Sequence, residues 1–143
     1  MKISKYFTLE EMTHTSSGIA NIPHDPEIIN NLTDLCNYVL DKIREEFGIV
    51  NITSGYRNTT VNEWAGGVPS SDHVKGYAAD FNVLNIPLYS IFEWIVTSDL
   101  QYDQVILEPR WIHISYNNKN RKTKLLAHNS NGKMSYSFYQ GAK

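Results

Sequence analysis

The sequence predicts an α+β fold, in which residues 1–143 form a single compact domain with a small antiparallel sheet flanked by helices. Its length of 143 residues lies within the roughly 100–200 residues of one domain. The first third of the chain carries a long helical pattern of apolar residues, whereas the second half holds short apolar runs between turn residues. Helices that precede strands in this way favour α+β over an alternating parallel α/β architecture.

The N-terminal segment predicts a short helix followed by a loop. Thr8 and Glu11 have the spacing of a capping box, in which each side chain bonds the backbone amide of the other residue. We therefore expect a helix over residues 9–14. Turn-forming residues fill positions 15–24, which we expect to be a loop.

A long amphipathic helix is predicted next, from Pro26 to Phe47. Asp25 is a suitable N-cap, Pro26 suits the first helical position, and Gly48 ends the pattern. Apolar residues recur every three or four positions, at Ile28, Ile29, Leu32, Leu35, Cys36, Val39, Leu40, Ile43 and Phe47. This helix should form a main wall of the core, with Cys36 as one of its small core residues.

The remaining elements are shorter. We expect strands over 49–53, 77–83, 104–107, 111–115 and 136–139, a short helix over 59–65 and a helix over 87–98. The basic stretch 117–124 is interpreted as a solvated turn, with steering toward anionic polymers as the alternative.

Composition excludes several classes of protein. Thirteen Lys and Arg against 15 Asp and Glu give a net charge of −2, which argues against a nucleic-acid partner. No apolar run approaches the ~20 residues of a membrane span, so we expect no membrane insertion. The first residues lack the pattern of a signal peptide, which predicts a protein that is cytoplasmic at synthesis. We also expect the protein to be a monomer.

Candidate metal ligands stand in the middle of the chain. The single cysteine excludes a cysteine-based zinc site, which leaves histidines and carboxylates. Asp80 and His113 each alternate with apolar neighbours, so their side chains can project from the same face of the sheet. A glycine turn at position 76 lets the loop that carries His73 fold back over that face. Taken singly, each of the three also fits a structural role, as a surface histidine, a turn carboxylate and a half-buried strand histidine.

Two blocks around these residues resemble the M15 zinc peptidases. They read SGYRNTTVNEWAGGVPSSDHVKGYAADFNV and DQVILEPRWIHIS, and they match the family's S-G-[YF]-R, S-x-H-x-x-G-x-A-x-D and W-[IV]-H motifs in order and spacing. Members include D-alanyl-D-alanine carboxypeptidases and phage-type L-alanyl–D-glutamate endolysins. The resemblance covers roughly residues 4–116 and implies a hedgehog/DD-peptidase-like fold.

The resemblance also implies roles for individual residues. His73, Asp80 and His113 fall on the three ligands of the Zn²⁺ cofactor, and Arg57 falls on the arginine that holds the substrate and the developing oxyanion. Two further positions fall on the substrate pocket, Ser71 and Asn62.

The general base departs from part of the family pattern. Many members carry Asp or Glu three residues before the last histidine, where this chain has Arg110. Glu108, at the end of the preceding strand, is our candidate for the base, and its alternative role is an ion pair with Arg110 or a nearby lysine. Trp111 lies two positions before His113 and is the best aromatic candidate to line the cleft.

These assignments predict a zinc-dependent peptidase that hydrolyses peptidoglycan stem-peptide bonds. The carboxypeptidase and endopeptidase alternatives stay open, because loops set the depth of the pocket. We expect a phage or prophage protein that acts on the cell wall after release during lysis, or as a virion component. The alternative is a catalytically inert phage structural or binding module on the same fold, which the departure at Arg110 favours.

Overall fold

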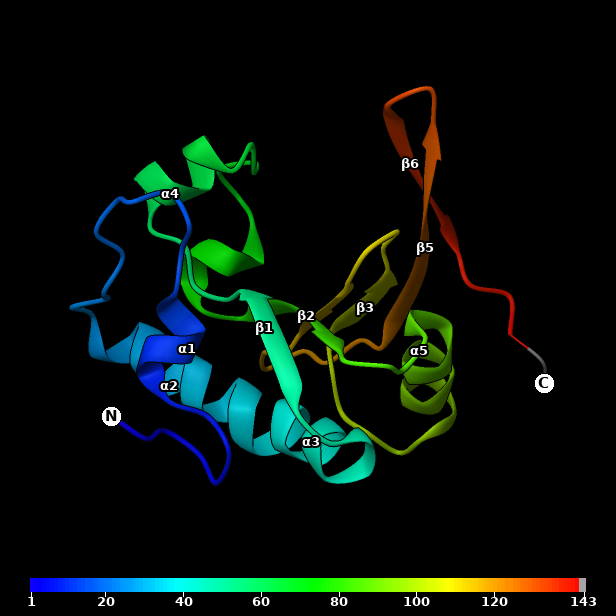
Figure 1. The fold of residues 1–143 in the computed structure, drawn as a ribbon, viewed down its shortest axis with the longest axis horizontal. Coiled ribbons are helices and arrows are strands. Elements are labelled where there is room, and N and C mark those ends of the chain that lie inside the picture. Colours follow the sequence, from blue (N-terminus) through cyan, green and yellow to red (C-terminus); the bar gives the residue numbers. More distant parts are fainter. Residues whose placement is uncertain (142–143) are drawn as a thin grey trace.

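The computed structural model describes residues 1–141 and confirms the α+β fold class. The elements are α1 (Leu9–Thr13), α2 (Pro26–Leu35), η1 (Cys36–Leu40), α3 (Asp41–Phe47), β1 (Val50–Ser54), α4 (Thr59–Trp64), η2 (Asp72–Lys75), β2 (Ala78–Val83), α5 (Leu88–Thr97), β3 (Gln104–Leu107), β4 (Ile112–Ser115), β5 (Thr123–Ser130) and β6 (Lys133–Phe138). The six strands form one sheet in the order β1-β2-β4-β3-β5-β6 (Figure 1). Buried apolar residues of α2, η1, α3 and α5 share one core with those of the strands.

The helices begin and end where the sequence predicts. The capping box of Thr8 and Glu11 is formed, and the Asp25 side chain accepts a hydrogen bond from the backbone of Glu27. The long helix differs from the prediction because η1 inserts five π-helical residues between α2 and α3. The apolar residues of this segment, Cys36, Val39 and Leu40, keep the three- and four-residue spacing of an α-helix, so the sequence pattern does not reveal the π segment. No helix among the described residues combines the length and the apolar character of a membrane span.

The register of the sheet separates a core face from an open face. Ala79, Ile114 and Val105 are neighbours across β2, β4 and β3, and all three are buried in the core. Side chains of the adjacent row point the opposite way, because successive residues of a strand alternate between faces. This second row crosses the whole sheet and consists of Ser54, Asp80, His113, Ile106, Leu125 and Phe138.

The C-terminal part corrects the predicted sheet. Strand β5 was not predicted, and it pairs parallel with β3, so the sheet is mostly rather than wholly antiparallel. Strand β6 begins at Lys133 instead of residue 136 and forms a hairpin with β5. The turn uses Asn131 and Gly132, both with positive φ, which is the conformation that Asn-Gly turns favour.

The basic stretch 117–124 is more than a solvated turn. The guanidinium of Arg121 donates two hydrogen bonds of 2.9 Å to the carboxylate of buried Asp103. The backbone amide of Arg121 donates a third, at 3.0 Å, to the same carboxylate. These bonds hold the pKa of Asp103 down at about 2 and anchor the segment that leads into β5.

Candidate active site

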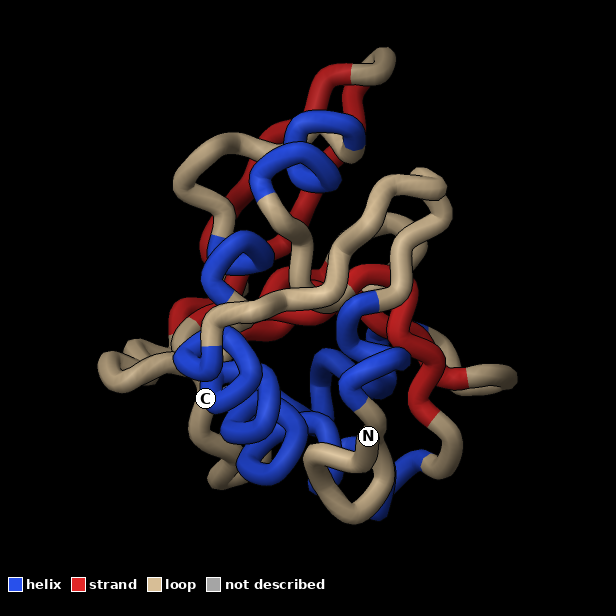
Figure 2. The backbone as a smooth tube through the Cα atoms, turned by 90° about the vertical axis from the view of Figure 1, so that its left-hand side faces the viewer, coloured by secondary structure: helices blue, strands red, loops and turns tan. Residues whose placement is uncertain are grey.

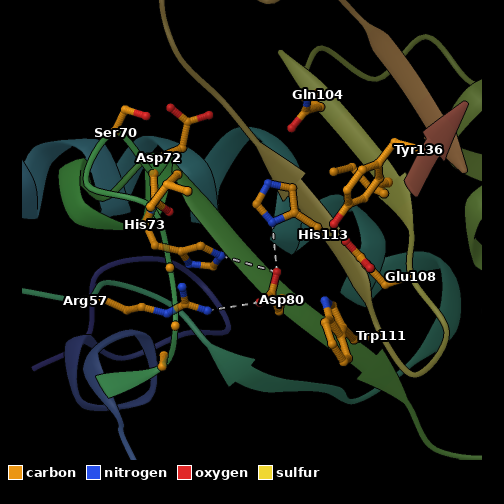
Figure 3. A pocket seen from close by; sticks show the side chains of 16 residues that line it. Arg57, Ser70, Asp72, His73, Asp80, Gln104, Glu108, Trp111, His113 and Tyr136 are labelled. Carbon is orange, nitrogen blue, oxygen red and sulfur yellow. Dashed lines mark hydrogen bonds and ion pairs between the residues drawn. The ribbon is translucent and has the colours of Figure 1, made fainter. Parts of the chain in front are cut away.

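A cleft of ≈ 480 Å³ lies on the open face of the sheet. One wall comes from the loop between α4 and η2, and the other from β3 and the hairpin β5–β6 (Figure 3). Its lining is Arg57, Ala65, Gly66, Gly67, Val68, Ser70, Ser71, Asp72, His73, Asp80, Gln104, Ile106, Glu108, Trp111, His113 and Tyr136. Of the predicted site residues, only Asn62 is outside this lining.

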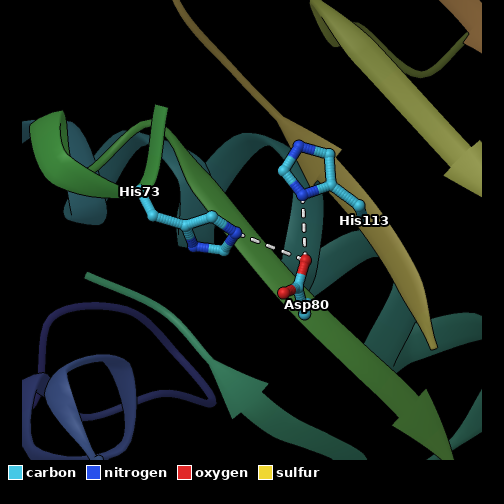
Figure 4. A group of neighbouring side chains, drawn as sticks. All are labelled: His73, Asp80 and His113. Carbon is cyan, nitrogen blue, oxygen red and sulfur yellow. Dashed lines mark hydrogen bonds and ion pairs between the residues drawn. The ribbon is translucent and has the colours of Figure 1, made fainter. Parts of the chain in front are cut away.

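Three potential metal ligands meet at the floor of the cleft. Asp80 and His113 are direct cross-strand partners on β2 and β4, and His113 Nδ1 lies 2.9 Å from Asp80 Oδ1. His73, on η2, brings its Nε2 atom to 3.4 Å from the same oxygen (Figure 4). One ligand atom from each residue fits within 4.8 Å of the others, so the group could hold a metal ion.

The donor set and its spacing fit zinc. Neutral imidazoles and a carboxylate are common zinc ligands, and three protein ligands that leave one position open are typical of catalytic sites. Around a tetrahedral ion with bonds of about 2.0–2.2 Å, ligand atoms lie roughly 3.3 Å apart. The separations of 2.9 and 3.4 Å from Asp80 to the two histidines are close to this spacing, and all three ligand atoms lie within 4.8 Å of one another.

The orientation of His73 is set by a backbone carbonyl. His73 Nδ1 lies 2.7 Å from the carbonyl oxygen of Gly55, which assigns the proton to Nδ1 and leaves the Nε2 lone pair directed at Asp80. Gly55 packs so closely on α1 that a Cβ atom there would lie 2.2 Å from the carbonyl oxygen of Met12. A glycine is therefore required at this position, and its carbonyl oxygen fixes the orientation of the His73 ring, as hydrogen-bond acceptors behind histidine ligands do in metal sites.

The short helix η2 is capped at both ends. The Ser71 side chain accepts a hydrogen bond of 3.3 Å from the backbone of His73. Gly76 ends the helix with φ of 77°, a conformation that favours glycine and turns the chain into β2. Ser71 thus lines the cleft, as predicted, and also shapes the segment that carries His73.

Asp80 is buried among groups that favour its ionised form. Burial alone would raise the pKa of this carboxyl, but hydrogen bonds with His113 and His73 outweigh it and hold the pKa below its ordinary value. Arg57 adds an ion pair, with 3.6 Å between its terminal nitrogen and Asp80 Oδ2. Asp80 is therefore an ionised carboxylate in position to act as a ligand.

Arg57 is braced on three sides at the edge of the cleft. It donates hydrogen bonds to Ser54 Oγ at 3.0 Å and to Asn62 Oδ1 at 3.3 Å, besides its ion pair with Asp80. The Asn62 amide in turn donates to the carbonyl of Val68, at 2.8 Å. Asn62 is buried beneath the cleft, so it positions Arg57 and the adjoining loop from below.

Glu108 follows β3 directly and lies on the side of the cleft opposite Arg57 (Figure 3). It is only 8% exposed, and burial raises the pKa of its carboxyl. Tyr136 lines the cleft beside it (Figure 3). Among the ion pairs of the described residues, none joins Glu108 to Arg110 or to a lysine. Half-buried Trp111 lines the same side, as predicted.

Sequence reasoning missed several residues of the cleft. Asp72, Gln104, Ile106 and Tyr136 all line it. The alternation of Met, Ser, Tyr, Ser and Phe near the C-terminus indicated a strand, but no local signal placed that strand beside Glu108. The other three histidines, His14, His24 and His128, are exposed and outside the metal-ligand group.

Fold and site together define a compact α+β fold with a candidate metal centre of the hydrolytic type. The family Peptidase M15 matches residues 5–115, well over half of the chain. The chain therefore belongs to the M15 peptidases, whose members are zinc-dependent metallopeptidases. No curated protein sequence matches it.

Proposed function

We propose that this protein is a zinc-dependent peptidase that hydrolyses bonds in the stem peptides of peptidoglycan. One observation carries the proposal: a His-Asp-His group, with His73 and Asp80 buried and His113 half-buried, lies between an arginine and a carboxylate on opposite sides of one open cleft. These are the parts that amide hydrolysis needs, namely a metal, a base and a cation for the developing charge.

Zinc would be held by His73 Nε2, an oxygen of Asp80 and His113 Nδ1. When bound, the ion supplies Lewis acidity, which lowers the pKa of a water and polarises a carbonyl group. The three side chains come from rigid segments, two from adjacent strands and one from a capped helix, so the site is organised before the substrate arrives.

Glu108 would act as the general base. Its carboxylate would take a proton from the attacking water and return it to the leaving amine. Burial raises its pKa toward neutrality, which makes it a better proton acceptor than an exposed glutamate and a better donor in the second step.

Arg57 would bind negative charge on the other side of the scissile bond. Its planar fork suits both the oxyanion of a tetrahedral intermediate and a terminal carboxylate of the substrate. A carboxypeptidase would use the second option, whereas an endopeptidase would use only the first. The cleft is open along the sheet, and both modes remain part of the proposal.

The proposed setting is the bacterial cell wall. The resemblance to phage endolysins supports action after release during lysis or as part of a virion. In this setting the only partner of the enzyme is the peptidoglycan, and we expect the monomer to be active.

The test is digestion of purified Gram-negative and Gram-positive peptidoglycan, with products mapped by mass spectrometry. We expect new amino termini or released D-alanine, zinc at one ion per chain, and loss of both in Asp80→Ala. His14→Ala, at an exposed histidine outside the group, is the matched control and should keep both. Bound zinc with no cleaved bond in any wall type would favour an inert module on this fold.

A further inference from the structure

The hairpin β5–β6 projects from the body of the fold (Figures 1 and 2), on the side away from α4 (Figure 1), and Tyr136 of β6 lines the cleft. It begins at residue 123, beyond the residues 5–115 that match the peptidase family. Strand β5 is hydrogen-bonded in parallel to β3, which leads directly into Glu108. The hairpin therefore has a fixed position relative to the cleft, and the family match assigns it no role.

One face of the hairpin continues the floor of the cleft. The row that contains Asp80, His113 and Ile106 extends through Leu125 to Phe138. Tyr136 and Met134 stand two and four positions before Phe138 on β6, so their side chains project from the same face of the hairpin as that of Phe138.

This face presents large side chains to solvent. Met134 is 39% exposed, Tyr136 52% and Phe138 69%, whereas the small Ser135 and Ser137 alternate with them on the other face. Contiguous exposed apolar side chains beside a cleft mark a binding surface. This exposed face is continuous with the cleft, because Tyr136 belongs to both.

Tyr136 connects the exposed strip to the chemistry. Its side chain lies beside Glu108 in the cleft (Figure 3). A tyrosine at this position offers a ring for packing and a hydroxyl that can also accept a bond from a peptide N–H. Arg57 and Tyr136 thus lie on opposite sides of the metal-ligand group, and a peptide that contacts both must cross it.

We propose that the hairpin is a substrate-binding arm. Tyr136 hydrogen-bonds the main chain of the stem peptide on the Glu108 side, and Met134 and Phe138 pack against its aliphatic groups. This inference rests on the proposed function and adds to it a binding surface for the part of the peptide farthest from Arg57.

The first test separates binding from chemistry. Metal-stripped protein, which cannot cleave, is sedimented with insoluble peptidoglycan, and the bound fraction is measured against protein concentration. Loss of one hydrogen bond weakens binding by about five- to tenfold, which we expect for Tyr136→Phe. The double variant Met134→Ser, Phe138→Ser should lose more than tenfold, because it removes two apolar contacts.

The second test uses the zinc-loaded enzyme on a soluble muropeptide. Tyr136→Phe should raise KM by a similar five- to tenfold and change kcat by less than threefold. Two matched controls should stay within twofold of the parent: Ser135→Ala, on the other face of β6, and Tyr89→Phe, a tyrosine of equal 52% exposure on α5. Equal zinc content and circular dichroism establish that the variants fold.

The outcomes separate the two proposals. If the parent protein binds and cleaves peptidoglycan and the Tyr136 and Met134/Phe138 variants do so equally well, the proposal of a substrate-binding arm is wrong and the proposed function stands. Parent protein that neither sediments with nor cleaves any peptidoglycan overturns the proposed function and the arm with it. Variants that sediment weakly while both controls match the parent support the arm.

Discussion

Replacing Glu108 by glutamine removes the proposed proton acceptor and changes little else. The two side chains have nearly the same shape. Glu108 has no ion-pair partner among the described residues, so the substitution leaves no opposite charge without its partner. We therefore expect a change of no more than ~1 kcal/mol in the free energy of unfolding and normal zinc binding.

The catalytic effect should be large. A positioned general base contributes about 10²–10⁴-fold to the rate, which corresponds to ~2.7–5.4 kcal/mol of transition-state stabilisation at 1.36 kcal/mol per factor of ten. We expect the upper part of this range, because Asp80 is committed to the histidines and Arg57 and cannot substitute for Glu108. The assay is kcat on a soluble muropeptide, with zinc measured by mass spectrometry.

Asp72 provides the matched control. Among the described residues, it is the one other carboxylate that lines the cleft besides Asp80 and Glu108. Asp72→Asn should keep kcat within about threefold of the parent. The assignment of Glu108 is refuted if Glu108→Gln binds zinc and keeps more than a tenth of the parental kcat, and Asp72 replaces it as the candidate if Asp72→Asn loses activity instead.

Three further predictions concern pH, charge and packing. The base must be ionised to work, and burial raises the pKa of Glu108 above 4.5. We therefore expect kcat/KM to rise with pH, with the midpoint of the acidic limb of the profile above 4.5. A Glu108→Asp variant whose acidic limb has the same midpoint as that of the parent would contradict this assignment. Arg57→Ala should lower kcat/KM by about 10²–10³, and Arg57→Lys should recover little, because lysine cannot contact Ser54, Asn62 and Asp80 together; steady-state kinetics test both. Gly55→Ala should cost about 2–4 kcal/mol in urea unfolding, because its Cβ would meet the chain of α1; wild-type stability would show that the contact relaxes.

The helices and the central strands could be predicted because their signals are local. Capping residues, the apolar spacing of the long helix and short alternating runs each depend on neighbours in sequence. The π-helical segment Cys36–Leu40 could not be predicted, because its apolar spacing is the same as that of an α-helix. Strand β5 was hidden by the basic residues before it, and its parallel pairing with β3 is a long-range contact with no local signal.

The candidate site divides in the same way. His73, Asp80, His113, Arg57 and Glu108 were singled out from motifs, and the structure brings their side chains into one cleft. The contacts that position these side chains could not be predicted from the sequence. The Gly55 carbonyl that orients His73 and the hairpin residue beside Glu108 depend on how distant segments meet.

The cross-strand partnership of Asp80 and His113 ties metal binding to correct folding of the sheet. Ile112 and Ile114, which flank His113, are both fully buried in the core. A slip of β4 by one residue would exchange the two faces, bury the imidazole under the helices and present an isoleucine to Asp80. Only the sheet with the correct register of β4 can therefore bind zinc, and the ion would stabilise that sheet relative to misfolded forms with a shifted register.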